Sequence, residues 1–370
     1  MRYNEVWGKK LSRLGFGGMR LPCESDGKID YAAAEAMVDR ALEAGINYFD
    51  TAYGYHGGQS ERFYGRALSR HAREKYLVAD KMPTWECHVP ADTDRLFAEQ
   101  CSRVQVDRFD FYLIHNIQDG NFAHVEEMEI IGNLARKREE GRIGHLGFSF
   151  HGSAELLERV LSGYGDVFEF VQLQLNYFDW EYINAKRLHE IARAHGKPIV
   201  VMEPVRGGML ASLSPEADAV YRAYCPDLSV ASYALRYAMQ LPGVMVTLSG
   251  MSNREQLEDN LKNADLPDLT EKDYAVIGKA LDVFRRNTLI PCTGCRYCMD
   301  CTVGLDIPGI FRAVNDARLS ADAARRLPER LPGLTGGKEC IACGKCVPYC
   351  PQHIEIPARM AEIAASMRKE

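Results

Sequence analysis

The sequence predicts an α/β fold in which a (β/α)8 barrel is followed by a small domain of helices and loops. Through about residue 265, short β-branched or aromatic runs alternate with amphipathic stretches, the order typical of a parallel sheet covered by helices. Near residue 288 the composition changes abruptly to Cys, Gly and Pro, and eight of the 12 cysteines lie between Cys292 and Cys350. We therefore expect a barrel domain over residues 1–287 and a second domain over residues 288–370.

Eight candidate strands each precede a helix-like segment. Their ranges are Leu14–Met19, Ile46–Thr51, Tyr76–Met82, Phe109–His115, Ile143–Ser149, Phe170–Leu175, Pro198–Glu203 and Val244–Ser249. Eight such units match a (β/α)8 barrel, whose active site is built where the strands reach their C-terminal ends. A doubly wound open sheet is the alternative. However, no G-x-G-x-x-G follows the first strand, and Gly15-Phe16-Gly17-Gly18 is as typical of a tight turn.

The composition narrows the class of protein. Of the 370 residues, 46% are hydrophobic and 26% are charged, which is ordinary for a globular chain. The net charge is -6 and the basic residues are scattered, so we expect neither a nucleic-acid partner nor an anionic membrane partner. No apolar run approaches the roughly 18 residues of a spanning helix, and the N-terminus carries no leader-like apolar segment. These features predict a cytoplasmic protein that acts on small molecules.

The clustered cysteines form two regularly spaced runs. They read Cys292-x2-Cys295-x2-Cys298-x2-Cys301 and Cys340-x2-Cys343-x2-Cys346-x3-Cys350-Pro351. The second run matches the bacterial ferredoxin pattern, in which three cysteines bind one 4Fe-4S cluster and the fourth reaches the other cluster. The sequence therefore predicts two [4Fe-4S] clusters with crossed ligation. One is expected on Cys292, Cys295, Cys298 and Cys350, and the other on Cys340, Cys343, Cys346 and Cys301.

The first run departs from the ferredoxin pattern at Cys301. Two residues rather than three separate Cys301 from Cys298, and Thr302 stands where Pro is usual. Two structural zinc sites are the alternative, because four cysteines in C-x2-C pairs also bind zinc. Compact triplets favour iron, since tetrahedral zinc needs only pairs joined by a long spacer. Metal is expected to supply part of the folding free energy of so small a domain.

Four polar side chains stand at the ends of different predicted strands. They are Asp50 and Tyr55 after the second strand, Lys81 ending the third and His115 ending the fourth. A barrel brings such side chains together at one mouth. Reduction of a carbonyl by hydride leaves an alkoxide that must be protonated, and a phenol is a slow acid near neutrality unless a cation lowers its pKa. Lys81 would supply the cation, Asp50 would hold it, and His115 would orient the carbonyl oxygen or relay the proton.

The motifs around these residues are those of a known family. The sequence resembles the aldo/keto reductases in Phe49-Asp50-Thr51-Ala52-x-x-Tyr55, Gly58-x-Ser60-Glu61, Lys81 and Leu113-Ile114-His115, over about residues 4–285. With its cysteine runs, the whole chain resembles the subgroup that carries a C-terminal 4Fe-4S ferredoxin-type domain. The resemblance implies a nicotinamide-dependent oxidoreductase that reduces an aldehyde or ketone, or oxidises an alcohol in reverse. Its catalytic residues would be Asp50, Tyr55, Lys81 and His115, with Tyr55 as general acid/base.

The resemblance also implies a cofactor site. Ser149 and Gln172 would contact the nicotinamide amide, and a helix N-terminus would hold the adenosine phosphates, because its exposed amides and dipole favour anions. The residues implied there are Ser249, Gly250, Met251, Arg254, Gln256 and Asn260. The sequence departs from the family where Phe150 replaces Asn, and where Gly250 and Gln256 replace the Lys and Arg that meet a 2′-phosphate. NADPH is the expected cofactor, with Arg254 as the substitute cation and NADH as the alternative.

The role of the clusters is open at this stage. A hydride carries two electrons, whereas a 4Fe-4S cluster exchanges one at a time, so electron transfer between them needs an intermediate such as flavin. The sequence has no flavin-binding fingerprint. The clusters would then either stabilise the C-terminal domain or connect it to an external electron carrier. The alternative function is an iron–sulfur electron-transfer protein whose barrel performs no nicotinamide hydride transfer.

Overall fold

The computed structural model describes residues 1–286 and 289–367 as two compact units. The first unit contains Met1–Pro204 and Ser232–Leu269. The second contains Val205–Ala231 and the chain from Thr270 onward. The expected domain boundary between residues 287 and 288 lies outside the described residues.

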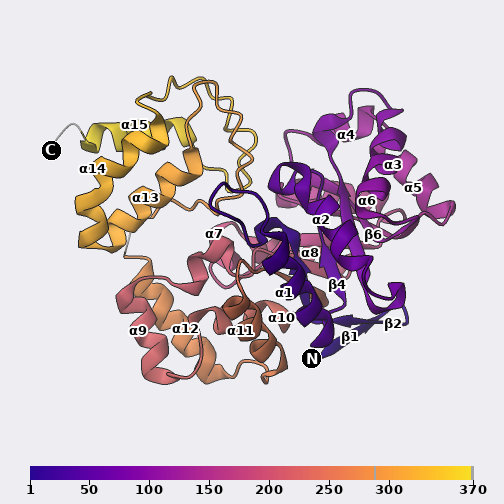
Figure 1. Ribbon diagram of the computed structural model, residues 1–370, viewed down its shortest axis with the longest axis horizontal. Helices are drawn as coiled ribbons and strands as arrows, with labels where there is room; N and C mark the ends of the chain where they lie inside the picture. Colours follow the sequence, from indigo (N-terminus) through magenta and orange to yellow (C-terminus); the bar gives the residue numbers. More distant parts are fainter. Residues whose placement is uncertain (287–288, 368–370) are drawn as a thin grey trace. The chain divides into compact units, whose positions relative to one another are not determined.

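The first unit is built on a closed barrel of eight parallel strands, as the sequence predicts (Figure 1). The order around the barrel is β10-β3-β4-β5-β6-β7-β8-β9. The strands are β3 (Leu14–Gly17), β4 (Tyr48–Asp50), β5 (Leu77–Met82), β6 (Phe109–Ile117), β7 (Ile143–Phe150), β8 (Phe170–Gln174), β9 (Ile199–Met202) and β10 (Val244–Gly250). Each differs from its predicted range by no more than two residues at either end.

A short hairpin precedes the barrel and was not expected from the sequence. It pairs β1 (Tyr3–Val6) with β2 (Lys9–Ser12) in antiparallel register. Leu11 of this hairpin packs into the barrel core beside Tyr48 and Phe111. The hairpin therefore buries one apolar side chain in a core whose remaining members come from the barrel strands.

The turn after β3 explains the glycine-rich run. A Cβ atom on Gly18 would lie 2.7 Å from Ser60 Oγ and 2.9 Å from the Asp50 carbonyl oxygen. These distances are shorter than real Cβ contacts, so only glycine fits. Gly18 allows the first strand to turn closely against Asp50 and Ser60, which is the tight turn expected of the Gly15-Phe16-Gly17-Gly18 run rather than a dinucleotide fingerprint.

Helices follow the strands in the alternating order expected of the fold. Those of the first unit are α1 (Tyr31–Glu43), α2 (Gln59–Leu68), α3 (Asp92–Val104), α4 (Phe122–Glu127), α5 (Ile130–Glu139), α6 (Ala154–Tyr164), α7 (Asp179–Tyr182), α8 (Ala185–Ala194), most of α10 (Val230–Met239) and α11 (Arg254–Asp265). Side-chain caps define several starts. Asp30, Ser153 and Asn253 each accept a backbone N–H of the first turn of the helix that follows.

The second unit contains helices from two parts of the chain. They are α9 (Pro215–Tyr224), α12 (Glu271–Phe284), α13 (Ile307–Leu319), α14 (Ala321–Thr335) and α15 (Ile356–Met367). The polar stretch before α12 was expected to introduce a helix, and Thr270 and Asp273 form a capping box there. The cysteine runs have a small apolar core, in which Cys298 and Cys350 are buried with Ile307, Phe311 and Ile356.

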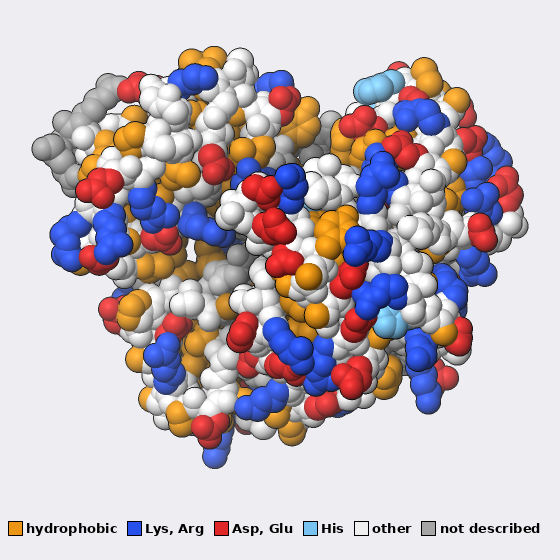
Figure 2. Space-filling model, in the orientation of Figure 1, with side chains coloured by type: hydrophobic (Ala, Val, Ile, Leu, Met, Phe, Trp, Pro, Cys, Tyr) orange, Lys and Arg blue, Asp and Glu red, His pale blue; other side chains and the backbone are white. Residues whose placement is uncertain are grey.

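The surface carries mixed charge. Basic and acidic side chains are interspersed over the face shown in Figure 2. Within the described part of the chain, no helix has both the length and the apolar character needed to cross a bilayer.

Candidate active site and cysteine cavities

The four predicted catalytic side chains converge at the C-terminal ends of three barrel strands. Asp50 ends β4, Lys81 lies in β5, His115 lies in β6, and Tyr55 begins the short 3-10 helix η2 (Tyr55–Gly58) after β4. Lys81 Nζ donates to Asp50 Oδ1 at 2.6 Å and to the Thr51 carbonyl at 2.7 Å. It also lies 3.5 Å from Tyr55 Oη. The rings of Tyr55 and His115 meet edge to face with centroids 6.0 Å apart.

The Lys81–Asp50 pair is buried. The side chains of Lys81 and Asp50 are 1% and 4% exposed. Burial raises the pKa of Asp50, while the Lys81 ammonium opposes that rise. A buried ion pair is costly to break, because removal of one partner leaves an uncompensated charge. The pair therefore holds the ammonium in a defined place beside the phenol.

The pKa of Tyr55 moves in the direction opposite to the one expected. Burial raises it well above its usual value, and the Asp50 and Glu203 carboxylates raise it further. The proximity of Lys81 does not produce the lowering predicted from the sequence, because the carboxylates and the loss of solvent dominate. Tyr55 therefore holds its proton at neutral pH, the state that a general acid needs.

His115 is held neutral. Burial lowers its pKa well below the usual value, and the charges of Lys81 and His151 lower it further. A neutral imidazole carries one N–H donor. Trp85, with its ring centroid 5.2 Å from that of His115, lies on the same side of the barrel.

Two charged residues near Tyr55 were not singled out from the sequence. Arg20 and Glu203 form an ion pair at 3.5 Å, and the charges of both act on the Tyr55 phenol. Glu203 follows β9 with φ 55, a backbone region that non-glycine residues seldom adopt. Both residues come shortly after the C-terminal end of a barrel strand. Polar side chains at such strand ends are candidates for the active site, so this criterion, which identified Asp50, could also have identified Arg20 and Glu203.

A buried polar network binds the backbone of Lys81. Gln100 Nε2 donates to the Lys81 carbonyl at 3.0 Å and to Glu61 Oε1 at 2.9 Å. Arg103 pairs with the other Glu61 oxygen at 2.7 Å. Asp80 Oδ1 accepts the Lys81 backbone N–H at 2.8 Å. The network fixes the backbone from which the ammonium extends.

Asp80→Asn is expected to stabilise the fold at neutral pH by on the order of 1 kcal/mol. Burial raises the pKa of Asp80 well above its usual value, and the Glu61 carboxylate adds to that rise. A carboxyl whose pKa is higher in the folded chain contributes stability at low pH, and loses it as the pH rises through the folded value. Asparagine has no charge to bury, so the advantage of the variant should grow with pH. Chemical denaturation at several pH values measures it.

The control for this prediction is Glu61→Gln, which removes the buried carboxylate partner of Arg103, leaves it only the partly exposed Glu99, and is expected to destabilise the fold. A stability loss in Asp80→Asn that is the same at every pH would contradict the assignment.

The two residues implied for the nicotinamide amide lie side by side on adjacent barrel strands. Ser149 of β7 and Gln172 of β8 are paired in register. Ser149 Oγ accepts the Asn116 backbone N–H at 2.8 Å. Gln172 is 2% exposed, and its Oε1 has no hydrogen-bond partner among the described residues. A buried acceptor of this kind fits the amide N–H of a nicotinamide.

The segment implied for the phosphates runs from the end of β10 into α11. Ser249 Oγ accepts from Asn260 Nδ2 at 2.9 Å, and Gln256 Oε1 accepts the Ser252 N–H at 2.8 Å. Gly250 packs against the Arg20 side chain, and Met251 is fully buried. Arg254 pairs with Glu258 at 3.5 Å and keeps 63% of its side chain exposed. The first turn of a 12-residue helix therefore has an accessible cation beside it, an arrangement that favours phosphate.

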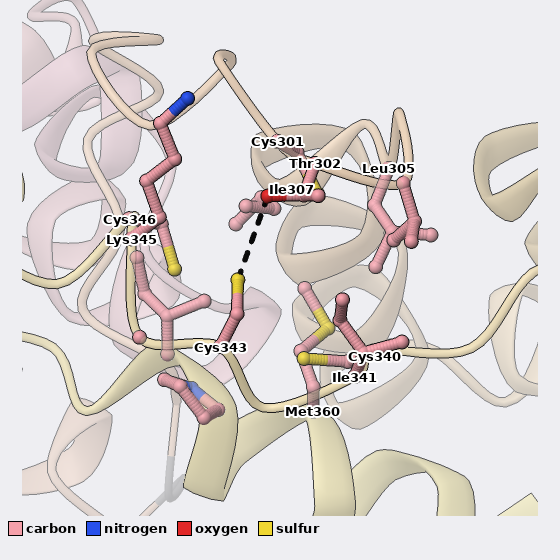
Figure 3. A pocket seen from close by; sticks show the side chains of 14 residues that line it. Cys301, Thr302, Leu305, Ile307, Cys340, Ile341, Cys343, Lys345, Cys346 and Met360 are labelled. Carbon is pink, nitrogen blue, oxygen red and sulfur yellow. Dashed lines mark hydrogen bonds between the residues drawn. The ribbon is translucent and has the colours of Figure 1, made fainter.

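The eight clustered cysteines line two separate cavities in the second unit. Figure 3 shows the first cavity, around which Cys301, Cys340, Cys343 and Cys346 are grouped. The second cavity is lined by Cys292, Cys295, Cys298 and Cys350. These are the two sets of four that crossed ligation predicts, since Cys301 joins the second run and Cys350 joins the first.

The cavities differ in their exposure to solvent. Burial raises the pKa of the Cys298 thiol to about 12, with further increases from Cys295 and Cys292. In the other cavity Cys343 is exposed, and hydrogen bonds from the Lys345 backbone and the Thr302 hydroxyl lower its pKa. Over residues 1–286 and 289–367, no three His, Cys, Asp or Glu side chains come together as a single metal ion would need.

Comparison with protein families finds two matches along the chain. Residues 13–282 match the aldo/keto reductase family, and residues 291–355 match a 4Fe-4S dicluster domain. The second match decides against the zinc alternative.

An L-galactose dehydrogenase from Arabidopsis thaliana is 27% identical over 278 residues, covering 69% of this chain and 84% of that protein. The uncharacterized oxidoreductase YqkF of Bacillus subtilis is 24% identical over 303 residues, covering 72% and 92%.

Solved structures share the barrel. An aldo-keto reductase from Bacillus halodurans, in its holo form, has a TM-score of 0.60 at 23% identity and covers 76% of this chain and 96% of its own. An aldo/keto reductase from Klebsiella pneumoniae in complex with NADP and acetate has a TM-score of 0.62 at 19% identity and covers 74% and 92%. The family match extends over more than half of the chain. The chain thus belongs to the aldo/keto reductase family, as an NAD(P)H-dependent oxidoreductase with a C-terminal 4Fe-4S domain.

Proposed function

We propose that this protein reduces an aldehyde or ketone, or oxidises the corresponding alcohol in reverse, with Tyr55 as general acid/base. The observation that carries the proposal is the buried Lys81–Asp50 ion pair, whose ammonium lies 3.5 Å from the Tyr55 hydroxyl. This arrangement supports the proposal, because a carbonyl oxygen bound at the barrel mouth would meet a protonated phenol beside a fixed cation and a neutral imidazole.

Each side chain has a distinct task in this proposal. Tyr55 donates its proton to the carbonyl oxygen as negative charge develops there, and the raised pKa keeps the proton available. Lys81, held by Asp50, stabilises the phenolate that remains. His115 donates a hydrogen bond that orients the carbonyl oxygen. In the reverse direction the phenolate removes the proton from the alcohol.

The barrel mouth also has groups suited to a nicotinamide cofactor. When bound, the reduced nicotinamide supplies the hydride to the carbonyl carbon. Gln172 Oε1 and Ser149 would hold its amide. Ser249, Gly250, Met251, Gln256 and Asn260 would shape the phosphate site around the start of α11, with Arg254 as its cation. We prefer NADPH to NADH, because the guanidinium of Arg254, although paired with Glu258, has a largely exposed side chain that would turn toward a 2′-phosphate.

Gln172→Leu is expected to weaken NADPH binding by roughly tenfold, the value of about one lost hydrogen bond to a buried partner. Equilibrium binding of NADPH and NADH to anaerobically purified protein, with iron and sulfide counted, measures it. The thermal unfolding midpoint without cofactor serves as the control for folding. Equal binding in the variant contradicts the assignment of Gln172. Absence of binding in cluster-loaded wild type would instead favour an electron-transfer protein whose barrel transfers no hydride.

We further propose that the second domain, residues 288–370, holds two [4Fe-4S] clusters with crossed ligation. Two sets of four thiols around separate cavities support this assignment. Each cluster stores one electron, so the clusters suit an external one-electron carrier rather than the hydride step of the barrel.

A further inference from the structure

A buried cation binds residues beside two of the four cysteines that line the cavity of Cys292, Cys295, Cys298 and Cys350. Arg206 is fully buried and has the largest volume of the fully buried side chains. Its Nη1 donates to the Pro291 carbonyl at 3.1 Å, and its Nη2 donates to Gln352 Oε1 at 2.9 Å. Pro291 directly precedes Cys292, and Gln352 follows Cys350 by two residues. One guanidinium therefore binds both chain segments that bring these cysteines together.

The backbone around Arg206 is fitted closely to the first cysteine run. Arg206 has φ 50 and Gly207 has φ 64, both in the left-handed region that is costly for residues with a Cβ atom. A Cβ atom on Gly207 would collide with the Thr293 carbonyl. The segment can approach the loop between Cys292 and Cys295 only because residue 207 is glycine.

Two cations stand near the first cysteine run. Arg206 donates to the carbonyl of Pro291, the residue before Cys292, and Arg312 follows Phe311, which lines the cavity. Arg206 is buried, but Arg312 on α13 is exposed. A buried charge keeps most of its effect, while an exposed one is weakened by water and salt. In the other cavity, the cation Lys345 is half exposed and pairs with Asp300 at 2.6 Å.

A cluster held by four thiolates gains one negative charge when it is reduced, so a nearby buried cation favours the reduced form. We propose that Arg206 raises the reduction potential of the cluster on Cys292, Cys295, Cys298 and Cys350, and that it does so for this cluster alone. The inference rests on the crossed ligation proposed above. Arg206 would thus set the reduction potential of one cluster through its charge, without binding iron.

The test is a redox titration followed by electron paramagnetic resonance on the anaerobically purified full chain, after iron and sulfide have been counted. In Arg206→Gln, the ratio of reduced to oxidised cluster at a fixed potential should fall about tenfold for one cluster, equivalent to about 59 mV for one electron. The signal of the other cluster should stay unchanged. Cys295→Ser identifies which signal belongs to which cavity, and its iron count tests the proposed ligation independently of Arg206.

Two matched variants separate charge from structure. Arg206→Lys keeps the charge and is expected to shift the potential much less than Arg206→Gln does. Arg312→Gln removes the exposed cation and is expected to have a small effect at most. If Arg206→Gln fails to retain iron, titration of Arg206→Lys at a pH high enough to neutralise the lysine should give the same fall. Unchanged potentials after loss of the charge, or equal shifts in both clusters, would overturn the proposal.

Discussion

Tyr55→Phe is expected to lower kcat for carbonyl reduction by about 10²–10⁴-fold, the usual contribution of a positioned general acid. The variant removes the hydroxyl that lies 3.5 Å from Lys81 Nζ, and keeps the ring that packs edge to face with His115. NADPH affinity and the unfolding midpoint should change little. Steady-state kinetics on a panel of aldehydes and ketones, with cofactor binding measured in parallel, gives the comparison.

Tyr53→Phe is the matched control for this prediction. Tyr53 belongs to the same loop, and its ring faces Arg103 rather than Lys81. It should retain activity close to that of the wild type. Full activity in Tyr55→Phe, or an equal loss in both variants, would show that the phenol of Tyr55 does not protonate the product.

The raised pKa of Tyr55 also predicts the pH profile of the reduction. An acid acts in its protonated form, so a pKa raised by burial extends the active range upward. The rate should stay flat through the pH at which a free tyrosine loses its proton, about 10. A fall that begins near neutral pH would mean that another group, or a cofactor-induced change in burial, controls the proton.

Loss of single cysteines is expected to remove cluster signals in a crossed pattern. Wild-type protein should contain about eight iron atoms per chain, as two [4Fe-4S] clusters require. Cys350→Ser should alter the same paramagnetic signal as Cys295→Ser, although 55 positions in the sequence separate the two residues. Cys301→Ser should alter the same signal as Cys343→Ser, because these residues line the other cavity. Spectra of the reduced proteins, normalised to iron content, measure the pattern.

Cys225→Ser is the control, because this cysteine lines neither cavity and should leave both signals intact. Shared signals for Cys301 and Cys295 would show that each run ligates its own cluster. An iron content near half of the expected value in wild type would show that only one cluster is held. Variants that lose a cluster should also unfold more readily in the second unit, since its apolar core includes Cys298 and Cys350.

Local sequence patterns predicted which segments form barrel strands better than they predicted the residues at which the strands begin and end. Alternation of apolar runs and amphipathic stretches located all eight strands, because strands in a parallel barrel are buried on both faces. The predicted strand Ile46–Thr51 is only Tyr48–Asp50 in the structure, since strand ends depend on pairing with neighbours. The hairpin of β1 and β2 was missed, because four-residue strands that include Lys9 and Lys10 carry little periodic signal.

The direction of the Tyr55 pKa could not be obtained from the sequence. The sequence placed one cation near the phenol, but the amount of water lost around the ring and the nearby Glu203 carboxylate depend on how distant segments pack. Arg206 illustrates the same limit. An arginine before two glycines is typical of an exposed loop, yet its partners lie 85 and 146 positions away and bury it completely.

The sequence by itself determined the order of strands and helices, the motif residues Asp50, Tyr55, Lys81 and His115, and the two cysteine runs. These features depend on periodicity and spacing along the chain, which are local properties. The ferredoxin pattern also predicted which cysteines share a cavity. Only the tertiary structure decided which acceptors stay buried without a partner among the described residues, and which charges are shielded from solvent. Those outcomes depend on distances between residues far apart in the chain and on the local dielectric. A short segment of sequence contains no information on either quantity.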